Sequence, residues 1–158
     1  MKKAARSKKP RSVSALESHL GYWLRFVSNR VSHAFSLKVQ ARGVTAAEWV
    51  VLRELYERED MPSALAERLG MTRGAISKLA ERLAAKGLIT REASDEDRRS
   101  QTLALTAAGG ALVPALAALA DENEEAFFGQ LDRSTRQTIE TAMREIVRRE
   151  GLRGMPVD

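Results

Sequence analysis

The chain has 158 residues, a formal net charge of +5 and no cysteine. This length fits one domain with a substantial core. The lack of cysteine excludes disulfides, thiolate metal sites and a switch based on cysteine oxidation. Glycine-rich phosphate loops, clustered metal ligands and a nucleophile paired with a histidine are also missing from the sequence. We therefore expect neither an enzyme nor a protein that carries a cofactor.

The start of the chain is strongly basic. Residues 1–12 contain six lysines or arginines and no acid, and without them the chain is nearly neutral. This segment has a proline and no apolar periodicity, so we expect a disordered basic tail. No apolar run follows its charges as in a signal peptide, and no stretch is long enough to span a membrane. The sequence therefore predicts a cytoplasmic protein without a membrane partner.

A long helix is predicted from Val13 to Arg42, because apolar residues recur there every three or four positions. A second row of side chains runs beside this apolar face at the same helical spacing: His19, Tyr22, Phe26, Arg30 and His33. The two histidines are fourteen residues apart and cannot bind one metal ion within a single chain. No metal site is expected.

The next helix is predicted to begin at a capping box. Thr45 and Glu48 have the spacing at which each side chain caps the backbone of the other residue. The helix should continue to about Arg58 and carry Trp49 among its apolar residues. Asp60-Met61-Pro62 then interrupts the chain before a further helix.

Residues 65–79 have the spacing of two helices joined by a tight turn. Gly70 lies in the turn, where a positive φ costs least for glycine, and Thr72 is a suitable N-cap for the second helix. The apolar residues of that helix follow the helical period, so its other side must face outward. The outward residues are Arg73, Gly74, Ser77, Lys78, Glu81 and Arg82. An ordinary antiparallel helix pair would show a similar pattern.

A predicted hairpin raises the specificity of this motif. Its strands are Leu88–Glu92 and Gln101–Leu105. A purely structural hairpin would have a tight turn with Gly or Asn, but here a charged loop, 93–100, joins the strands. Arg98 and Arg99 in this loop can reach a DNA groove, while Asp97 pairs with and orients one of them. Two helices followed by such a wing are typical of a winged helix-turn-helix that binds DNA.

The basic residues gather on this part of the chain, whereas acidic residues gather on a later helix, at 121–125. The basic set comprises Arg68, Arg73, Lys78, Arg82, Lys86, Arg91, Arg98 and Arg99. Charge is thus segregated along the chain in a way that favours DNA binding by the motif. For the tail, contact with DNA and simple solvation both remain open.

Three segments carry a resemblance to a known family: Gly-Leu-Ile-Thr-Arg at 87–91, Asp-Arg-Arg at 97–99, and Leu-Ala-Leu-Thr at 103–106 with Gly109 beyond. In this order they resemble the signature of the MarR (multiple antibiotic resistance regulator) family of bacterial transcription factors. By order of elements the resemblance extends over roughly residues 13–150. It implies a homodimer that binds a pseudo-palindromic operator and is usually released by a small ligand.

The resemblance also implies a domain plan. The fold is expected to be mainly α with a small β-hairpin wing, in which a winged helix-turn-helix, 45–106, is flanked by dimerisation helices at 13–42 and 107–150. Residues 151–158 form a C-terminal tail. The DNA-binding residues would be Arg73, Gly74, Ser77, Lys78 and Arg82 on the recognition helix and Asp97, Arg98 and Arg99 in the wing. Of the wing arginines, Arg99, held by Asp97, is expected to enter the minor groove.

The flanking helices have their own sequence support. Thr106 caps a long helix that Gly109, Gly110 and Pro114 should kink or delay, and a final amphipathic helix runs from Ser134 to about Arg149. Long terminal helices that are apolar on more than one face favour burial in a twofold partner.

The row on the first helix suggests a site for the releasing ligand. Tyr22 and Phe26 would stack on an aromatic acid or phenol, Arg30 or His33 would meet its carboxylate, and Trp49 would wall the same space. Packing at the dimer interface is the alternative, and aromatic rows at helical spacing more often pack than bind ligands. For the whole chain, a ligand-independent architectural DNA-binding protein and an all-helical adaptor remain alternative functions.

Overall fold

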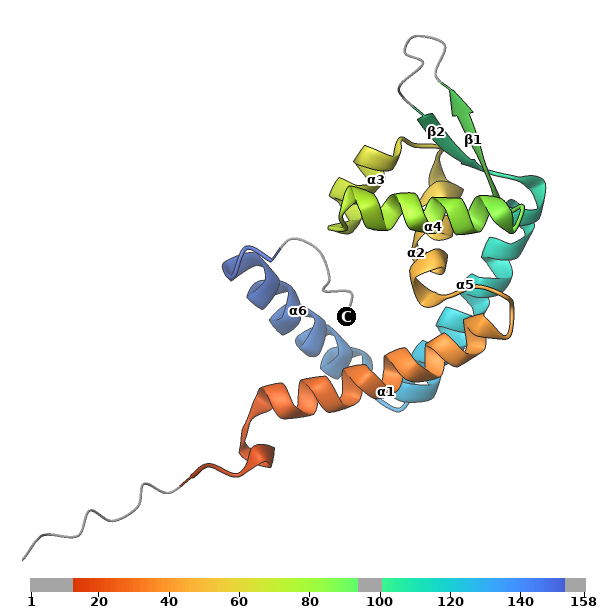
Figure 1. The fold of residues 1–158 in the computed structure, drawn as a ribbon. Helices are drawn as coiled ribbons and strands as arrows, with labels where there is room; N and C mark the ends of the chain where they lie inside the picture. The colour runs from red at the N-terminus through yellow and green to blue at the C-terminus, as the bar shows by residue number, and fades with distance from the viewer. Residues whose placement is uncertain (1–12, 94–100, 153–158) are drawn as a thin grey trace, which may run out of the picture.

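The structure is a computed structural model that describes residues 13–93 and 101–152. It is mostly helical with one antiparallel hairpin, as the sequence predicts (Figure 1). The elements are the 3₁₀ helix η1 (Leu16–Ser18), α1 (Leu20–Gln40), α2 (Ala46–Glu57), α3 (Pro62–Leu69), α4 (Arg73–Ala85), β1 (Ile89–Ala93), β2 (Gln101–Leu105), α5 (Ala107–Phe128) and α6 (Arg133–Arg149).

The first helix begins later than expected. The prediction of a helix from Val13 is wrong for its first residues, because η1 occupies 16–18 and α1 begins only at Leu20. Two side chains bind carbonyls that a continuous helix would use for its own ladder. The Ser18 hydroxyl donates to Ala15 O at 2.7 Å, and Trp23 Nε1 donates to Glu17 O at 2.9 Å. These local bonds compete with helix formation.

The core lies in the winged head, which we define as α2, α3, α4 and the hairpin together with the ends of α1 and α5 that pack on them. Its largest fully buried apolar side chains come from almost every one of these elements: Val39, Val51, Leu52, Leu65, Ile76, Leu83, Leu103, Val113 and Leu116. The hairpin pairs Ile89 with Leu105, and a backbone bridge between Asp60 and Leu103 joins it to the bend before α3. The head is therefore closed within one chain.

α5 begins directly after Thr106, whose side chain accepts a hydrogen bond from Gly109 N at 3.1 Å. The expectation that its glycines delay the helix is wrong, and α5 continues through Pro114 to Phe128. Gly109 packs so closely on the strand entry that a Cβ there would overlap the carbonyl of Leu88. A glycine is needed at this position for a close approach and not for a break.

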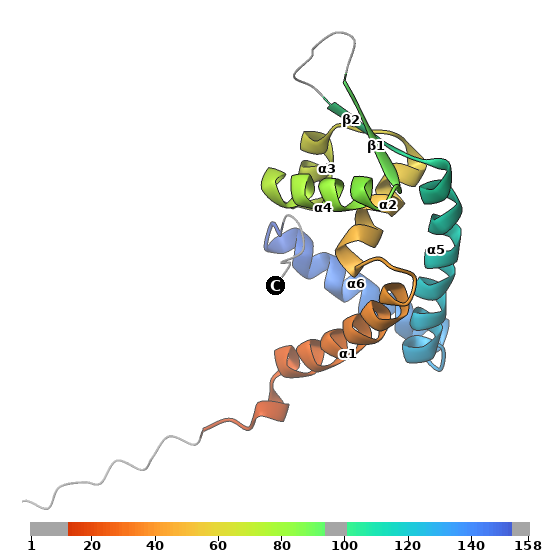
Figure 2. The same cartoon turned by 45° about the vertical axis from the view of Figure 1, so that its right-hand side comes forward.

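The terminal helices lie outside this core. Figures 1 and 2 show α1 and α6 diverging from the end of α5. Only Val39 is buried in α1, and α6 has no buried residue. Between them lies an apolar groove of about 540 Å³, lined on the α1 side by Leu20, Trp23, Leu24 and Val27 and on the α6 side by Ile139, Met143 and Ile146. Across the described ranges, no helix is long and apolar enough to cross a membrane.

Candidate nucleic-acid interface

The turn between α3 and α4 has the geometry that the sequence predicts. Gly70 adopts the left-handed conformation, with φ 64° and ψ 26°, and its neighbour Met71 donates to Ala66 O at 2.9 Å. Thr72 caps α4, because its hydroxyl accepts from Ala75 N at 3.1 Å. These bonds fix the angle at which α4 leaves the turn.

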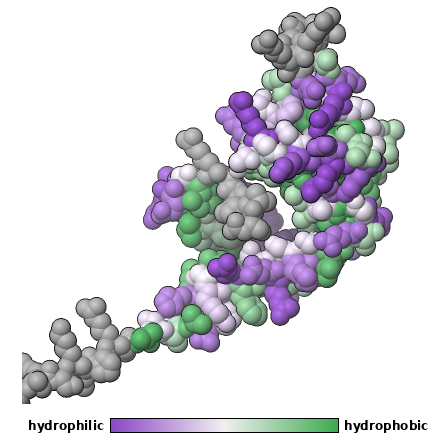
Figure 3. All heavy atoms as spheres, in the orientation of Figure 1, coloured by the Kyte–Doolittle hydropathy of each residue, from purple (hydrophilic) through white to green (hydrophobic). Residues whose placement is uncertain are grey.

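α4 presents a polar face to solvent. Its inner side is held in the core by Ile76, Leu79, Ala80 and Leu83. The predicted contact residues Arg73, Gly74, Ser77, Lys78 and Arg82 are all exposed. A Cβ on Gly74 would meet nothing within 4 Å, so this face is open to close approach by a ligand. Figure 3 shows hydrophilic residues gathered over α3 and α4, whereas hydrophobic residues are visible on α6.

The cations of α4 fall into two groups. Arg73 and Lys78 make no ion pair with any residue that the structure describes. Arg82 and Lys86, one and two turns beyond Lys78, both contact Glu48 of α2. Arg73 and Lys78 are therefore the cations of this helix that an incoming polyanion meets without displacing a protein partner.

Glu48 is fully buried and is the centre of a charged network. Its Oε2 accepts from Thr45 N at 2.8 Å and from Lys86 Nζ at 2.7 Å, while Arg82 Nε lies 3.2 Å from Oε1. Burial alone would raise the pKa of Glu48, but the hydrogen bonds from Lys86 and Thr45 and the charges of Lys86 and Arg82 hold the pKa below its ordinary value. The capping box is confirmed, whereas its two cationic partners were not foreseen.

Arg68, one of the basic residues that gather on the motif, has a structural role. It is bound to Asp60 and, at 3.1 Å, to Glu54, so it ties α3 to α2 and to the bend before α3. Burial alone would raise the pKa of Asp60. The hydrogen bond from Arg68 and the positive charge of Arg68 outweigh this effect, so the pKa lies below its ordinary value. This structural role of Arg68 depends on Glu54 and Asp60, which precede it by more than two helical turns, and the charge pattern of the sequence does not indicate it.

The wing continues from α4 through Gly87, whose φ of 71° ends the helix. β1 and β2 pair in antiparallel register from Ile89–Leu105 to Ala93–Gln101. Arg91 of β1 donates to Ser77 O at 3.2 Å, which connects the wing to the middle of α4. The predicted wing contacts Asp97, Arg98 and Arg99 lie outside the described residues.

The predicted ligand residues are only partly together. Tyr22 and Phe26 stack with ring centroids 6.3 Å apart, and the Arg30 guanidinium lies 5.9 Å from the Phe26 centroid. Trp49 instead packs edge-on against Phe35, at 6.4 Å.

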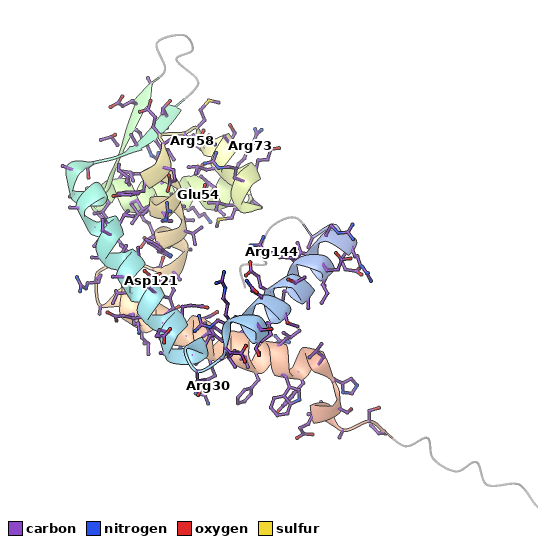
Figure 4. All side chains as sticks on the ribbon, turned by 180° about the vertical axis from the view of Figure 1, so that it is seen from behind. Arg30, Glu54, Arg58, Arg73, Asp121 and Arg144 are labelled. Atoms are coloured by element: carbon purple, nitrogen blue, oxygen red, sulfur yellow. The ribbon has the colours of Figure 1, made fainter. Side chains whose placement is uncertain are left out.

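Phe35 is two residues after His33, so it lies on a different face of α1 from the row. The expectation that Trp49 walls the same space is therefore wrong within one protomer. The row itself is largely exposed. Figure 4 shows Arg30 at the opposite end of the molecule from Arg73. Within residues 13–93 and 101–152, no group of three His, Asp or Glu side chains is placed to hold a metal ion.

Comparisons with known proteins agree with this geometry. A family model described as MarR family matches residues 42–100, which span α2 to the wing. The organic hydroperoxide resistance transcriptional regulator of Bacillus subtilis is 29% identical over 98 residues, which are 61% of this chain and 67% of that protein.

Solved structures extend the similarity to the terminal helices. A probable transcriptional regulator from Pseudomonas aeruginosa superposes with a TM-score of 0.74 at 26% identity, over 84% of this chain and 99% of that one. Bordetella bronchiseptica BpsR, solved to explain how 6-hydroxynicotinic acid regulates its DNA binding, superposes with a TM-score of 0.76 at 24% identity, over 85% and 97% of the two chains.

Proposed function

The chain belongs to the MarR family of transcriptional regulators, and we propose that it is a homodimeric repressor that binds a pseudo-palindromic operator and is released by a small aromatic ligand. The exposed face of α4, with Arg73, Ser77 and Lys78, carries the proposal, because the opposite face of the helix is fixed in the core. A helix held in this way enters the major groove, where its side chains meet base edges.

Dimerisation is supported by the apolar groove between α1 and α6. The exposed side chains that line it, including Trp23 and Met143, would be covered by the same helices of a second copy. Twofold symmetry then places two copies of α4 in successive major grooves, about 34–36 Å apart. An operator with two inverted half-sites follows from this arrangement.

Side chains of α4 divide into base contacts and phosphate contacts in this proposal. Ser77 and Lys78 face outward near the middle of the helix and meet base edges, with Arg73 near its start. Arg82, at the edge of the exposed face, meets a backbone phosphate. For the wing, we propose that Arg99, oriented by Asp97, enters the minor groove, where A·T-rich sequence concentrates negative potential.

Selection from a random duplex library tests this assignment. We expect enrichment of a pseudo-palindromic sequence, to which Ser77→Ala and Lys78→Ala bind more weakly by about 1–3 kcal/mol for each base contact that the substitution removes. Arg99→Ala should weaken binding much more than Arg98→Ala. Equal reductions on selected and random DNA would contradict the base contacts. Uniform binding without enrichment would favour an architectural DNA-binding protein.

The releasing ligand is proposed to be an aromatic carboxylate or phenol that binds at Tyr22, Phe26, Arg30 and His33. A guanidinium beside stacked rings suits such a ligand, and the similar protein BpsR is regulated by 6-hydroxynicotinic acid. This chain has no cysteine to oxidise, which favours a noncovalent ligand.

A titration with salicylate-like acids, followed by tryptophan fluorescence and operator affinity, tests the ligand. Saturation should weaken operator binding by about 5–150-fold, and operator DNA should weaken the acid by the same factor. Arg30→Ala should abolish binding of the acid. Weaker binding of the acid by Trp49→Ala would show that the ligand also contacts α2. Unchanged binding by Arg30→Ala would contradict the site.

A further inference from the structure

Glu48 differs from the other acids of α2 in being fully buried while it contacts two cations of the recognition helix. We propose that Glu48 is a positioning residue for DNA binding, which orients Arg82 so that the free edge of its guanidinium meets a backbone phosphate. The inference rests on the proposed function, since it assumes that α4 lies on DNA.

The contacts of Arg82 leave a suitable edge free. Its Nε lies 3.2 Å from Glu48 Oε1, and its two Nη atoms make no hydrogen bond to any residue within the described ranges. The Arg82 side chain is 54% exposed. With its Nε side paired to a buried carboxylate, the Arg82 guanidinium turns its two terminal N–H groups away from the protein, and this fork matches the oxygens of a phosphate.

Lys86 has a different role in the same network. Its ammonium donates to Glu48 Oε2 at 2.7 Å and to Gly43 O at 2.9 Å, so two of its three donors bind the protein. These bonds fasten the end of α4 to the corner between α1 and α2. One carboxylate thus fastens the helix through Lys86 and aims a side chain outward through Arg82.

The capping box alone does not explain a charged residue at this position. A glutamine would accept the same bond from Thr45 N, which Glu48 Oε2 accepts at 2.8 Å. A buried carboxylate has a desolvation cost that only well-placed cations offset. Oε1 accepts no hydrogen bond of regular geometry, and the cation that faces it is Arg82, whose Nε lies 3.2 Å away. The charge of Glu48 is therefore matched to Arg82 and Lys86 and not to the cap.

Glu48→Gln keeps the helix cap but removes the charge, so it separates the two roles of Glu48. Glu54→Gln is a matched control. Glu54 is on the same helix and also contacts an arginine, Arg68, so both substitutions remove one negative charge from α2. General electrostatics predicts that either change strengthens binding to DNA. The positioning role predicts the opposite sign for Glu48→Gln alone.

The probe is a labelled duplex of mixed sequence and about 30 base pairs, titrated with the full chain by fluorescence anisotropy from about 50 to 200 mM salt. At the lowest salt, Glu48→Gln should weaken binding about tenfold. The slope of log affinity against log salt should become shallower by about 0.9 for each phosphate that the protein no longer neutralises. Arg82→Ala should have the same effect, and the double variant should be no weaker than Arg82→Ala alone. Glu54→Gln should keep the full slope.

Three results would overturn the inference while leaving DNA binding intact: an unchanged slope in Glu48→Gln, tighter binding by Glu48→Gln, or a further full reduction in affinity on adding Arg82→Ala to it. A wild-type chain that binds no duplex would instead overturn the proposed function. Should Glu48→Gln not fold, the Nε–H resonance of Arg82, assigned by its absence in Arg82→Ala, provides the test. Its nitrogen-15 relaxation should show restricted motion in both free and DNA-bound protein, and a freely moving group in the complex would contradict the inference.

Discussion

The winged head and the terminal helices differ in how their apolar residues are covered. In the head, side chains such as Leu52 and Leu83 are fully buried by elements of the same chain. On α1 and α6, side chains of the same kind, such as Trp23 and Met143, remain almost half exposed. The head is complete in one chain, whereas the apolar faces of the terminal helices are uncovered and, in the proposed function, meet a second copy. Stability of the head should therefore be independent of protein concentration, and stability of the terminal helices should depend on it.

The largest expected effect compares a truncation in each region. Leu52→Ala should lower the free energy of unfolding by about 2–5 kcal/mol at every protein concentration, because it opens a cavity in the core. Met143→Ala should instead act mainly through dimer dissociation. Urea unfolding of both variants at two protein concentrations separates the effects. A concentration-independent destabilisation in Met143→Ala would mean that α6 is covered within its own chain.

Two neighbouring glycines of α5 sharpen the comparison within the head. Gly109→Ala places a Cβ against the carbonyl of Leu88 and should lower stability by about 1–3 kcal/mol. Gly110→Ala meets nothing within 4 Å and should raise stability by about 0.5–1 kcal/mol, because alanine favours the helix. Thermal unfolding of both variants gives the two signs. Equal shifts would show that α5 does not pack closely on the entry to β1.

Local signals in the sequence predicted the parts of the head that depend on local physics. The structure confirms the predicted caps Thr45, Thr72 and Thr106 and the turn glycine Gly70. The sequence could predict them because each acts on backbone within three residues of itself. The outward face of α4 follows from the helical period and is also confirmed.

Partners distant in the chain could not be predicted in this way. The charge pattern gathers Arg68, Arg82 and Lys86 on the motif, but it contains no sign that each also contacts an acid of α2 or of the bend after it. Trp49 is predicted to wall the space beside the aromatic row, but it packs on Phe35. A pattern along one helix gives the face of a residue, and only the packing between helices decides what covers that face.

Acid should weaken the contacts that hold α4. The pKa of Glu48 is lower in the folded than in the unfolded chain, so the folded state binds the proton less tightly. The stability from this carboxylate is therefore fully present above its ordinary pKa of 4.5 and is lost as the pH falls through the lower, folded value. At neutral pH, Glu48→Gln should be less stable than wild type by about 1–2 kcal/mol. Urea unfolding at several pH values should show this difference shrink below pH 4.5, and a constant difference would contradict the charged network.

The measurement that tests the account most directly is the mass of the protein in solution. One chain has a mass of 17.5 kDa. If α1 and α6 complete their apolar faces with a second copy, light scattering at micromolar concentration should give twice this value. A mass of one chain under these conditions would contradict the twofold partner and, with it, the paired recognition helices on which operator binding depends.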